Sequence, residues 1–587
     1  MRFLLGYGSC GIASGADSVL KSLESAFSGT EYFVEKVGCN GLCFAEPIVE
    51  VITDDNESIL YGRLNGESAS KFAEAIKKGE LPLENRLSDE DMRFLNGQKR
   101  VVLSGCGKVN PESIDSYISF GGYSALKKAL ELGSDGIIEE IKKSGLRGRG
   151  GAGFPTHIKW QSAKSSQGEE KYIVCNADEG DPGAFMDRAV LEGDPHRVLE
   201  GMMISGIAVG ANTGIIYVRA EYPLAVKRLN KAIEEMRERK ILGENIFGSD
   251  FSFDFYIMMG AGAFVCGEET ALLASLGGNR GMPITKPPFP AQKGFRGKPT
   301  NINNVETFAN VSWIIENGGE AFAEMGTEGS KGTKVFALAG RVSRGGLVEV
   351  PMGLTINDIV FGICGGIKDG ADIKAVQMGG PSGGCIPKNM LDTVIDYESI
   401  AKTGAIMGSG GMIVMDENTC MVDMAKFFMD FTSKESCGKC VPCRIGTTRM
   451  LEILQRIVDG NGEEGDIDTI VELGESIKTG ALCGLGNSAP NPVLTTVKYF
   501  RDEYEAHIRD KACPAKKCTS LIEYRIIEDK CKGCSLCSKK CPVDAISGVV
   551  KSPFSIDSDK CVRCSQCFDS CRFGAIEIIS GKERNKK

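Results

Sequence analysis

The sequence lacks the features of membrane, secreted and nucleic-acid-binding proteins. No apolar run approaches the roughly 20 residues that span a bilayer, and Met1–Leu5 does not begin a secretory signal. The net charge is -9, and the chain has no basic block apart from Lys582–Lys587, which we predict to be a frayed tail. We therefore expect a cytoplasmic protein without a membrane span and without nucleic acid as its main partner.

Histidine is also scarce, at 3 residues, and no Ser/His/Asp, Cys/His or paired acid–base constellation stands out. We expect His157 and His196 to form local hydrogen bonds. Cysteine and glycine are instead abundant, at 23 and 74 of 587 residues, and the cysteines are clustered. In a reducing compartment such clusters are metal ligands rather than disulfides. Four cysteines stand apart and are expected in hydrophobic cores: Cys175, Cys266, Cys364 and Cys385.

A chain of this length is too long for one hydrophobic core, so the sequence predicts a multidomain α/β protein. Helix-like and strand-like stretches alternate first, glycine-rich short strands follow, and helical periodicity then dominates. The predicted parts are a small α/β domain at 1–85, a linker at 86–124, a larger α/β domain at 125–330, a small mixed domain at 331–410, a helical domain at 411–518 and a repeat at 519–587.

Individual elements are predicted from the same periodicity. In the first domain we expect helices at Ala16–Phe27 and Ser68–Lys78 and strands at Tyr32–Val37 and Ile48–Ile52. In the helical domain we expect four helices, at Met421–Phe431, Thr448–Val458, Asp466–Ile477 and Pro492–Ile508.

The strongest motif is a C-x2-C-x2-C-x3-C spacing that occurs twice near the C-terminus. Three cysteines at this spacing wrap one cubane cluster and the fourth reaches the other cluster, as in bacterial ferredoxins. The sequence therefore predicts two [4Fe–4S] clusters, with a zinc module or a disulfide knot as the alternative. One cluster is assigned to Cys531, Cys534, Cys537 and Cys571, and the other to Cys561, Cys564, Cys567 and Cys541.

A third cysteine run lies in the predicted helical domain. Cys437, Cys440 and Cys443 again have C-x2-C-x2-C spacing, and Cys483 is the best candidate for a remote fourth ligand. Three thiolates from one loop plus one remote thiolate are typical of a [4Fe–4S] site. Zinc is the alternative, because C-x2-C also suits that metal.

A glycine-rich segment lies in the larger α/β domain. Gly148–Gly153 matches G-x-G-x-x-G, but the preceding Asp135–Ser144 has a helical pattern, so we reject the Rossmann fingerprint, which follows a strand. The remaining interpretation is a loop whose backbone approaches a phosphate group closely, with Arg149 and Lys159 balancing the negative charge of the phosphate. Two acidic turns follow and are either solvated or part of a site: Asp178–Asp181 and Glu268–Glu269.

A group of one histidine and two cysteines lies between the predicted helical domain and the C-terminal repeat. His507, Cys513 and Cys518 have H-x5-C-x4-C spacing, which suits a structural zinc clamp. Cys420 is a candidate fourth ligand. The alternative is that the cysteines are ordinary buried thiols.

Five segments of the larger α/β domain together resemble the FMN-containing, NADH-binding flavoprotein subunit of respiratory NADH dehydrogenase. They are Leu146–Trp160, Asn176–Arg188, Gly260–Leu273, Lys286–Pro290 and Thr300–Thr307, and Glu435–Arg444 continues the pattern. With its added N-terminal and ferredoxin segments, the chain is similar to the beta subunit of soluble NAD-dependent, electron-bifurcating [FeFe]-hydrogenases. The resemblance covers residues 100–587.

The resemblance implies FMN and NAD(H) as cofactors, a Rossmann-like FMN domain and a ubiquitin-like (SLBB-type) domain at 331–410. Around the flavin it places Gly148, Arg149, Gly150, Lys159, Asn176, Asp178, Gly267, Asn303 and Asn304. Around the nicotinamide nucleotide it places Phe154, Glu179, Asp181, Phe264, Glu268, Glu269, Lys286 and Phe289. Glu179 and Asp181 are the expected catalytic residues. Phe264 and Asp181 depart from the family, which has Tyr and Glu at these positions. Phe264 therefore lacks a hydroxyl group, and the Asp181 carboxylate extends less far from the backbone.

The first domain resembles a thioredoxin-like [2Fe–2S] domain, but that family uses four cysteines and only three are present. They are Cys10, Cys39 and Cys43. No cysteine stands near Leu5 or Gly6, where the first would lie. Either another residue replaces it, or the cluster is absent and the domain docks a partner. The replacements considered are a remote group, such as Cys106, and two serines, Ser9 and Ser14.

The resemblance implies a diaphorase subunit of a soluble hydrogenase complex. Hydride exchange between NAD(H) and FMN is the cofactors' chemistry, and single electrons then pass through the clusters. A second hypothesis places the module in a NAD-dependent formate dehydrogenase or another bifurcating complex, and a third makes it a non-catalytic electron-wire or scaffold subunit. Within a hetero-oligomer the expected partners are a hydrogenase-type catalytic iron–sulfur subunit, a small thioredoxin-like [2Fe–2S] subunit and ferredoxin.

Overall fold

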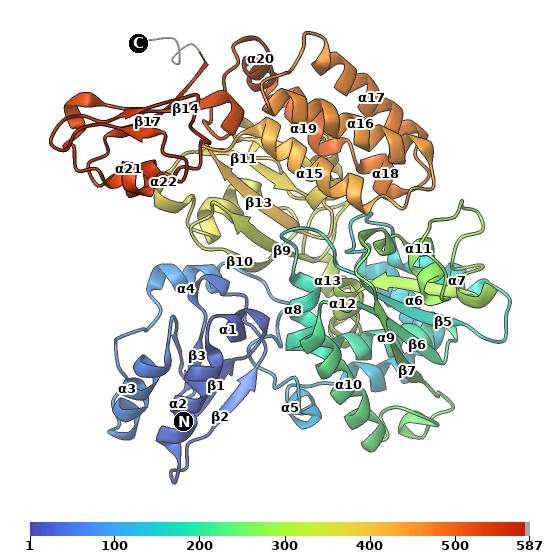
Figure 1. Ribbon diagram of the computed structural model, residues 1–587. Coiled ribbons are helices and arrows are strands. Elements are labelled where there is room, and N and C mark those ends of the chain that lie inside the picture. The colour runs from blue at the N-terminus through green and yellow to red at the C-terminus, as the bar shows by residue number, and fades with distance from the viewer. Residues whose placement is uncertain (582–587) are drawn as a thin grey trace. The chain divides into compact units, whose positions relative to one another are not determined.

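The computed structural model describes residues 1–581 (Figure 1). The tail Lys582–Lys587, predicted to be frayed, lies outside the described residues. Among the residues described, no helix combines the length and the apolar character that a membrane crossing requires. The chain forms two compact units, which are Met1–Met415 with Leu482–Leu485, and Asp416–Ala481 with Gly486–Lys587.

The N-terminal domain is a four-stranded sheet of order β2-β1-β3-β4 with two helices packed on it. Its elements are β1 (Arg2–Gly6), α1 (Ser9–Ala13), α2 (Ala16–Phe27), β2 (Val34–Val37), η1 (Cys43–Ala45), β3 (Val49–Ile52), β4 (Ser58–Tyr61) and α3 (Gly66–Lys77). Strand β1 pairs in parallel with β2 and antiparallel with β3. Phe3, Leu23 and Phe72 join sheet and helices in one core. The predicted helices and strands of this domain are confirmed.

The segment 86–124, predicted to be a linker, is instead structured and partly buried. It contains α4 (Asp89–Asn96) and α5 (Ile114–Ser119). Phe94 is fully buried, and the backbone N–H groups of Val102 and Leu103 donate to the Glu349 carboxylate at 2.9 and 2.8 Å. The prediction was wrong. Exposed charged residues dominate the segment, but a few apolar residues such as Phe94 are buried and fix it in place.

The larger α/β domain is built on four parallel strands of order β7-β6-β5-β8. Because each strand returns through a helix, the strands are parallel and helices pack against them. Its elements are α6 (Ser124–Ser144), α7 (Thr156–Ser165), β5 (Tyr172–Ala177), α8 (Met186–Gly193), α9 (Pro195–Val209), β6 (Thr213–Arg219), α10 (Pro223–Glu238), β7 (Asp254–Gly260), η3 (Phe264–Gly267), α11 (Glu269–Leu276), β8 (Thr300–Asn304), α12 (Val305–Asn317) and α13 (Gly319–Ala323).

The small mixed domain is a five-stranded sheet of order β10-β9-β13-β11-β12. Its elements are β9 (Thr333–Gly340), β10 (Gly346–Pro351), β11 (Ile373–Met378), β12 (Gly384–Pro387), α14 (Tyr397–Thr403) and β13 (Gly411–Asp416). The predicted boundary at residue 410 was wrong, because it separates the central strand β13 from β9, with which it pairs in parallel. This pairing joins segments far apart in sequence, so local pattern does not reveal it.

The second unit begins with a helical bundle. Its helices are α15 (Met421–Glu435), α16 (Val441–Val458), α17 (Asp466–Gly480), α19 (Asn491–Tyr499) and α20 (Arg501–Arg509). The short helix α18 (Gly484–Ser488) begins in residues assigned to the first unit and ends in the second. The first three predicted helices are confirmed. The fourth, predicted at Pro492–Ile508, is two helices, because Phe500 leaves the helical conformation at φ -136° and ψ 37°.

The C-terminal domain contains two two-stranded sheets and two short helices, of which β14, β17, α21 and α22 are labelled in Figure 1. Its elements are β14 (Ile522–Ile526), α21 (Leu536–Lys540), β15 (Ile546–Ser547), β16 (Ser555–Ile556), α22 (Gln566–Ser570) and β17 (Ile576–Ser580). Strand β14 pairs with β17, β15 pairs with β16, and both pairs are antiparallel. Each short helix contains the third cysteine of its motif, Cys537 in α21 and Cys567 in α22, and the two helices pack against one another.

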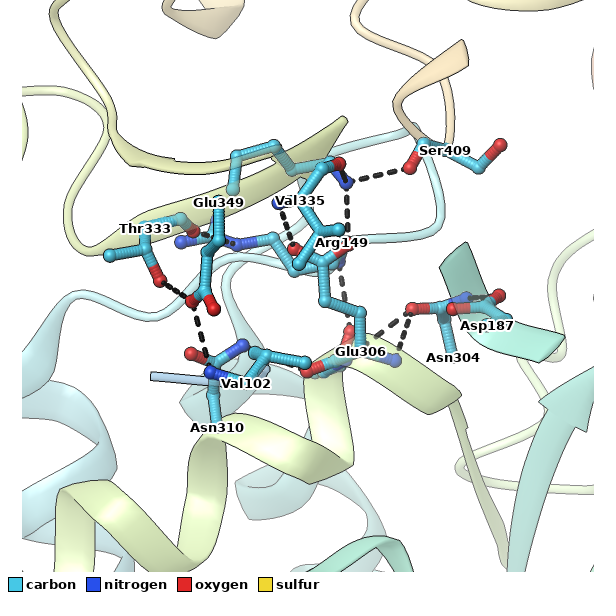
Figure 2. Close-up of polar contacts among 12 residues, drawn as sticks. Val102, Arg149, Asp187, Asn304, Glu306, Asn310, Thr333, Val335, Glu349 and Ser409 are labelled. Atoms are coloured by element: carbon cyan, nitrogen blue, oxygen red, sulfur yellow. Dashed lines mark hydrogen bonds and ion pairs between the residues drawn. The ribbon is translucent and has the colours of Figure 1, made fainter. Parts of the chain in front are cut away.

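A buried polar network ties the larger α/β domain to the small mixed domain (Figure 2). The Lys334 ammonium group, on β9, forms an ion pair with the Glu306 carboxylate of α12, and both side chains are almost fully buried. Lys334 also donates to the Ser409 carbonyl oxygen at 2.6 Å. Glu306 in turn accepts from the Val335 N–H group at 2.9 Å. Three segments are thus held at one point.

We expect Lys334→Met to lower the free energy of unfolding of this unit by about 3–5 kcal/mol, because it leaves the Glu306 charge buried and unpaired. Denaturant unfolding followed by tryptophan fluorescence measures this, since Trp160 and Trp313 are the chain's 2 tryptophans and both lie in the larger α/β domain. Lys71→Met, at an exposed ion pair of α3, is the matched control and should leave the midpoint unchanged. An unchanged midpoint in Lys334→Met would contradict the assignment.

Candidate cofactor and cluster sites

The predicted flavin residues gather at the carboxyl ends of two neighbouring strands. β5 and β8 are adjacent and parallel, and Asn176 pairs in register with Asn304. The strand order reverses here, because β6 and β7 lie on the other side of β5. In open α/β sheets, ligands bind outside the carboxyl ends of the strands at such a reversal. The structure thus places Asn176, Asp178, Asn303 and Asn304 at one sheet edge.

Two glycine-containing loops line this edge. The Asn176 side-chain amide donates to the Gly267 carbonyl oxygen at 2.9 Å. A Cβ added at Gly267 would meet only the Asp178 carbonyl oxygen, at 3.7 Å, and one at Gly148 would meet nothing nearer than 3.6 Å. Gly150 lies against Asn304: a Cβ added at Gly150 would lie 3.1 Å from the Asn304 Cβ. Exposed glycine backbone at strand ends fits a flat, phosphate-bearing ligand.

The Arg149 side chain does not have the predicted role of balancing phosphate charge. Its guanidinium is buried and donates to the carbonyl oxygens of Thr333 at 3.1 Å and Lys331 at 2.6 Å. It therefore fastens the glycine loop to the small mixed domain. Lys159 remains beside the edge, where its ammonium donates to the Ile302 carbonyl oxygen at 2.9 Å.

Sequence reasoning missed several residues that position this loop. The Thr307 hydroxyl accepts from the Arg149 N–H group at 2.8 Å. The Tyr397 hydroxyl donates to the Gly148 carbonyl oxygen at 2.9 Å, and a Cβ at Gly153 would lie 2.7 Å from the Tyr397 ring. Tyr397 belongs to another domain, so no sequence signal near the loop could have found it.

The predicted nicotinamide-side acids form a charged group with two lysines. The Lys286 ammonium lies 2.7 Å from the Glu269 carboxylate and 3.2 Å from that of Glu268, and Lys159 lies 3.4 Å from Glu269. Burial alone would raise the pKa of Glu269, but the two lysines lower it. Glu268 also caps α11 by accepting from the Ala271 N–H group at 2.9 Å. The lowered pKa keeps the Glu269 carboxylate ionised beside the two ammonium groups.

The two predicted catalytic carboxylates are both held by protein donors. Glu179 accepts from the N–H groups of Asp187 and Arg188, each at 3.0 Å, at the start of α8, and burial raises its pKa. Asp181 accepts from the Ser409 hydroxyl at 2.7 Å, and burial raises its pKa to about 6. Their contact with a nicotinamide remains a prediction.

Aromatic side chains at the same edge differ in exposure. Phe154 and Phe289 are 50% and 51% exposed, so their rings are available for stacking. Phe264 is half-buried against Gly180, where an added Cβ would lie 2.7 Å from the ring. Glycine at that position therefore permits the close approach of the β5 and β7 loops.

The C-terminal domain contains two cavities, and each is lined by four cysteines. Both cavities are open to solvent on one side. The cysteines of the first cavity are Cys531, Cys534, Cys537 and Cys571. Those of the second cavity are Cys541, Cys561, Cys564 and Cys567. Each set takes three residues from one motif and the fourth from the other motif.

The third cysteine run forms the loop between α15 and α16. Cys437 and Cys440 lie in this loop, and Cys443 lies in the first turn of α16. The Arg444 guanidinium donates to the Gly438 carbonyl oxygen at 2.6 Å, which closes the loop. Cys483 follows the C-terminal end of α17. Its predicted role as fourth ligand remains a prediction.

Four buried side chains come together where the helical bundle meets the C-terminal domain. Cys420, His507, Cys513 and Cys518 place their ligand atoms within 4.8 Å of one another. His507 Nε2 lies 3.4 Å from Cys420 Sγ and 3.3 Å from Cys518 Sγ. His507 Nδ1 lies 2.7 Å from the Glu503 carbonyl oxygen, which orients the ring as in metal sites. Three thiols and one imidazole suit tetrahedral zinc.

The three N-terminal cysteines also come together. Cys43 lies in side-chain contact with both Cys10 and Cys39. The Arg188 guanidinium of α8 reaches Cys10 Sγ at 3.8 Å. The positions where the absent fourth cysteine would lie, Leu5 and Gly6, belong to β1.

Comparison with known protein families identifies three parts of the chain. The Nuo51 FMN-binding domain matches residues 141–313. The iron–sulfur binding region of NADH-ubiquinone oxidoreductase-F matches residues 423–507. The 4Fe-4S binding domain matches twice, at 524–547 and 554–577. FMN and 4Fe–4S clusters are therefore confirmed as cofactors.

Individual relatives extend over most of the chain. The NADP-reducing hydrogenase subunit HndC of Solidesulfovibrio fructosivorans is 58% identical over 78% of this chain and 93% of the relative. The F 2 subunit of NADH-quinone oxidoreductase from Rhizobium meliloti is 45% identical over 68% of this chain and 96% of the relative. The crystal structure of an NAD+-reducing [NiFe]-hydrogenase in the H2-reduced state is 29% identical, with a TM-score of 0.63, covering 86% of this chain and 84% of that one.

Because each cavity takes cysteines from both motifs, double substitutions can test which cysteines share a cluster. Cys531→Ser with Cys571→Ser should remove one cluster, about four irons, because both residues line the same cavity. Cys531→Ser with Cys541→Ser should remove two clusters, about eight irons, because these residues line different cavities. Iron analysis of anaerobically purified protein measures the difference. Equal losses in the two double variants would rule out the crossed assignment.

Proposed function

The chain belongs to the family of the NADH-quinone oxidoreductase F subunits, and from this premise we propose that it is the diaphorase subunit of a multi-subunit hydrogenase. In this role it exchanges hydride between NAD(H) and FMN and passes single electrons through cysteine-bound clusters. The observation that carries the proposal is the glycine-lined edge between β5 and β8, in a chain that also holds three cysteine-rich cluster motifs.

The residues present fit FMN. The exposed backbone at Gly148 and Gly267 would receive the flavin and its phosphate, with the Asn176 amide and the Lys159 ammonium beside them. When bound, the flavin converts a two-electron hydride into single electrons. The protein orients it, since Thr307 and Tyr397 fix the glycine loop from two domains.

On the nicotinamide side, the charged group of Glu268, Glu269, Lys159 and Lys286 would orient the dinucleotide, with Phe154 and Phe289 available for stacking. Glu179 and Asp181 then act as positioning residues, because their carboxylates hold α8 and Ser409 in place. Relatives are named for NADP as well as NAD, so both nucleotides belong in the assay. We propose NAD(H) as the substrate.

We expect Gly267→Leu to abolish flavin binding, because the new side chain fills the open space at the sheet edge. Bound FMN and the reduction of a viologen dye by NADH should both fall about ten-fold or more, a loss of at least about 1.4 kcal/mol in binding. Gly362→Leu is the matched control: Gly362 also faces open space and lies far from the site in sequence. A parent protein that binds FMN but gives no dye reduction with either nucleotide would instead favour a non-catalytic scaffold.

Beyond the flavin, we propose three [4Fe–4S] clusters as the electron path. One is held by Cys437, Cys440, Cys443 and Cys483, and two by the C-terminal cavities. The hydrogenase role, with an iron–sulfur catalytic subunit, a small thioredoxin-like subunit and ferredoxin as partners, is supported by relatives named as hydrogenase subunits. Electron bifurcation and a cytoplasmic location complete this proposal. Molybdenum in the purified native complex would point to a formate dehydrogenase instead.

We further propose that Cys420, His507, Cys513 and Cys518 bind a structural zinc ion that fastens the C-terminal domain to the helical bundle. The Cys513 N–H group donates to the Ser580 hydroxyl at 2.8 Å, so the site and β17 are directly joined. A closed site of four protein ligands contributes to folding rather than to catalysis.

We expect Cys518→Ala to lose about one equivalent of zinc, because a closed tetrahedral site needs all four ligands. Elemental analysis after dialysis measures it. Cys364→Ala is the control, since Cys364 is a fully buried thiol in a different core. Undiminished zinc in Cys518→Ala would mean that these residues are ordinary buried side chains.

A further inference from the structure

The N-terminal domain holds a carboxylate where the fourth cysteine is missing. A Cβ added at Gly6, at the end of β1, would lie 3.3 and 3.4 Å from the two carboxylate oxygens of Glu46. A Cβ added at Gly11 would lie 3.2 Å from the same carboxylate. The Glu46 side chain therefore occupies the volume that a side chain at position 6 would enter.

The Glu46 carboxylate is buried without a counter-charge. The residue is 8% exposed, and one carboxylate oxygen, Oε2, accepts from the Ile48 N–H group at 3.1 Å. The other oxygen, Oε1, has no hydrogen-bond partner among the described residues, and no ion pair of Glu46 is found in that part of the chain. Buried carboxylates are normally paired with a cation or bound to a metal.

Glu46 is continuous with the three cysteines. The Cys39 thiol contacts the Glu46 carboxylate, and Cys43 contacts both Cys39 and Cys10. Together they form a chain of four possible metal ligands, three thiols and one carboxyl group. The carboxylate completes the number of ligands that a [2Fe–2S] centre needs.

The three replacements suggested by the sequence fit the cysteine group less well. The Ser9 hydroxyl donates to the Glu192 carboxylate at 2.6 Å. Ser14 is exposed after the end of α1. Cys106 is buried in the core of the larger α/β domain. Glu46 is thus the better candidate.

The spread of the group argues against a single metal ion. Among residues 1–581, the set of Cys420, His507, Cys513 and Cys518 is the one whose ligand atoms all lie within 4.8 Å of one another. The N-terminal group has no three such atoms at that spacing, so it is wider than the cage of a single ion. A two-iron cluster separates the ligands of its two irons in this way.

We propose that Glu46 is the fourth ligand of a [2Fe–2S] cluster, which it would hold together with Cys10, Cys39 and Cys43. The proposal deepens the proposed electron-transfer function, because it adds a one-electron centre next to the flavin domain. Arg188 contacts Cys10, and its backbone N–H group donates to Glu179 at the nicotinamide side. Helix α8 is 8 residues long, or about 12 Å, so the two sites are close.

The test uses the full chain purified without air and reduced with dithionite. A reduced [2Fe–2S] cluster keeps a sharp EPR signal at liquid-nitrogen temperature, where the fast-relaxing [4Fe–4S] signals broaden away. The parent should show this signal, and Glu46→Gln should lose it together with about two irons per chain, because a neutral amide is a poor ligand for ferric iron. Dithionite replaces NADH as reductant, so the result is independent of whether the chain oxidises NADH.

Ser9→Ala is the matched control. It removes the neighbouring hydroxyl but no proposed ligand, and the signal should remain. A parent without the signal, or Glu46→Gln with the parent signal unchanged, would overturn the proposal. So would loss of the signal in Ser9→Ala with retention in Glu46→Gln, which would make Ser9 the ligand.

A rescue variant covers the case in which Glu46→Gln does not fold. Gly6→Cys combined with Glu46→Ala puts a thiol on β1 and removes the carboxylate from its space; Gly6 does not have a positive φ, so a side chain is tolerated. The signal should return with g values shifted from those of the parent, because four thiolates replace three thiolates and a carboxylate. A folded rescue variant with no signal would refute the placement of the ligand.

Discussion

The start of α12 is the constraint on which the arrangement of the first unit depends. Within one turn, Asn304 caps the helix and donates to Asp187, Glu306 pairs with Lys334, and Thr307 accepts from the glycine loop (Figure 2). These contacts lead to α8, to β9 and to the Gly148 segment. Buried polar groups are costly unless all are satisfied, so this network permits one arrangement of three segments and disfavours others. The open edge beside β5 is a consequence of that fixed arrangement.

The sequence predicted those features whose physics is local. Cysteine spacing determines which thiolates can wrap one cluster, and the two C-terminal cavities contain the sets that spacing assigned. Helical and strand periodicity likewise predicted α2, α15 and β3. The predictions failed for features that depend on contacts between residues far apart in the sequence. The predicted domain boundary separated β13 from its sheet, because its partner β9 lies far from it in the sequence. Segment 86–124 was predicted to be a linker because the contacts that fix it, such as that of Val102 with Glu349, are also far apart in the sequence.

Arg149 shows why residue type alone misleads at a site. An arginine in a glycine-rich loop is a reasonable phosphate ligand, yet its donors face the carbonyl oxygens of Thr333 and Lys331. Its contribution to the site is indirect, because it fixes the loop whose backbone faces the ligand. Helix α8 has a similar double role. Glu179 accepts at its N-terminal end, and its Arg188 side chain contacts Cys10 of another domain.

Two buried carboxylates of the first unit follow the same electrostatic rule with different outcomes. Glu306 has its cation within the chain, since Lys334 is buried beside it. Glu46 is also buried, but its neighbours are Cys39 and the backbone of Gly6 and Gly11, which bring no positive charge. A protein does not keep a buried negative charge beside thiols without compensation. The compensation must then be protonation, which leaves three cysteines without purpose at this spacing, or a metal centre that uses all four groups.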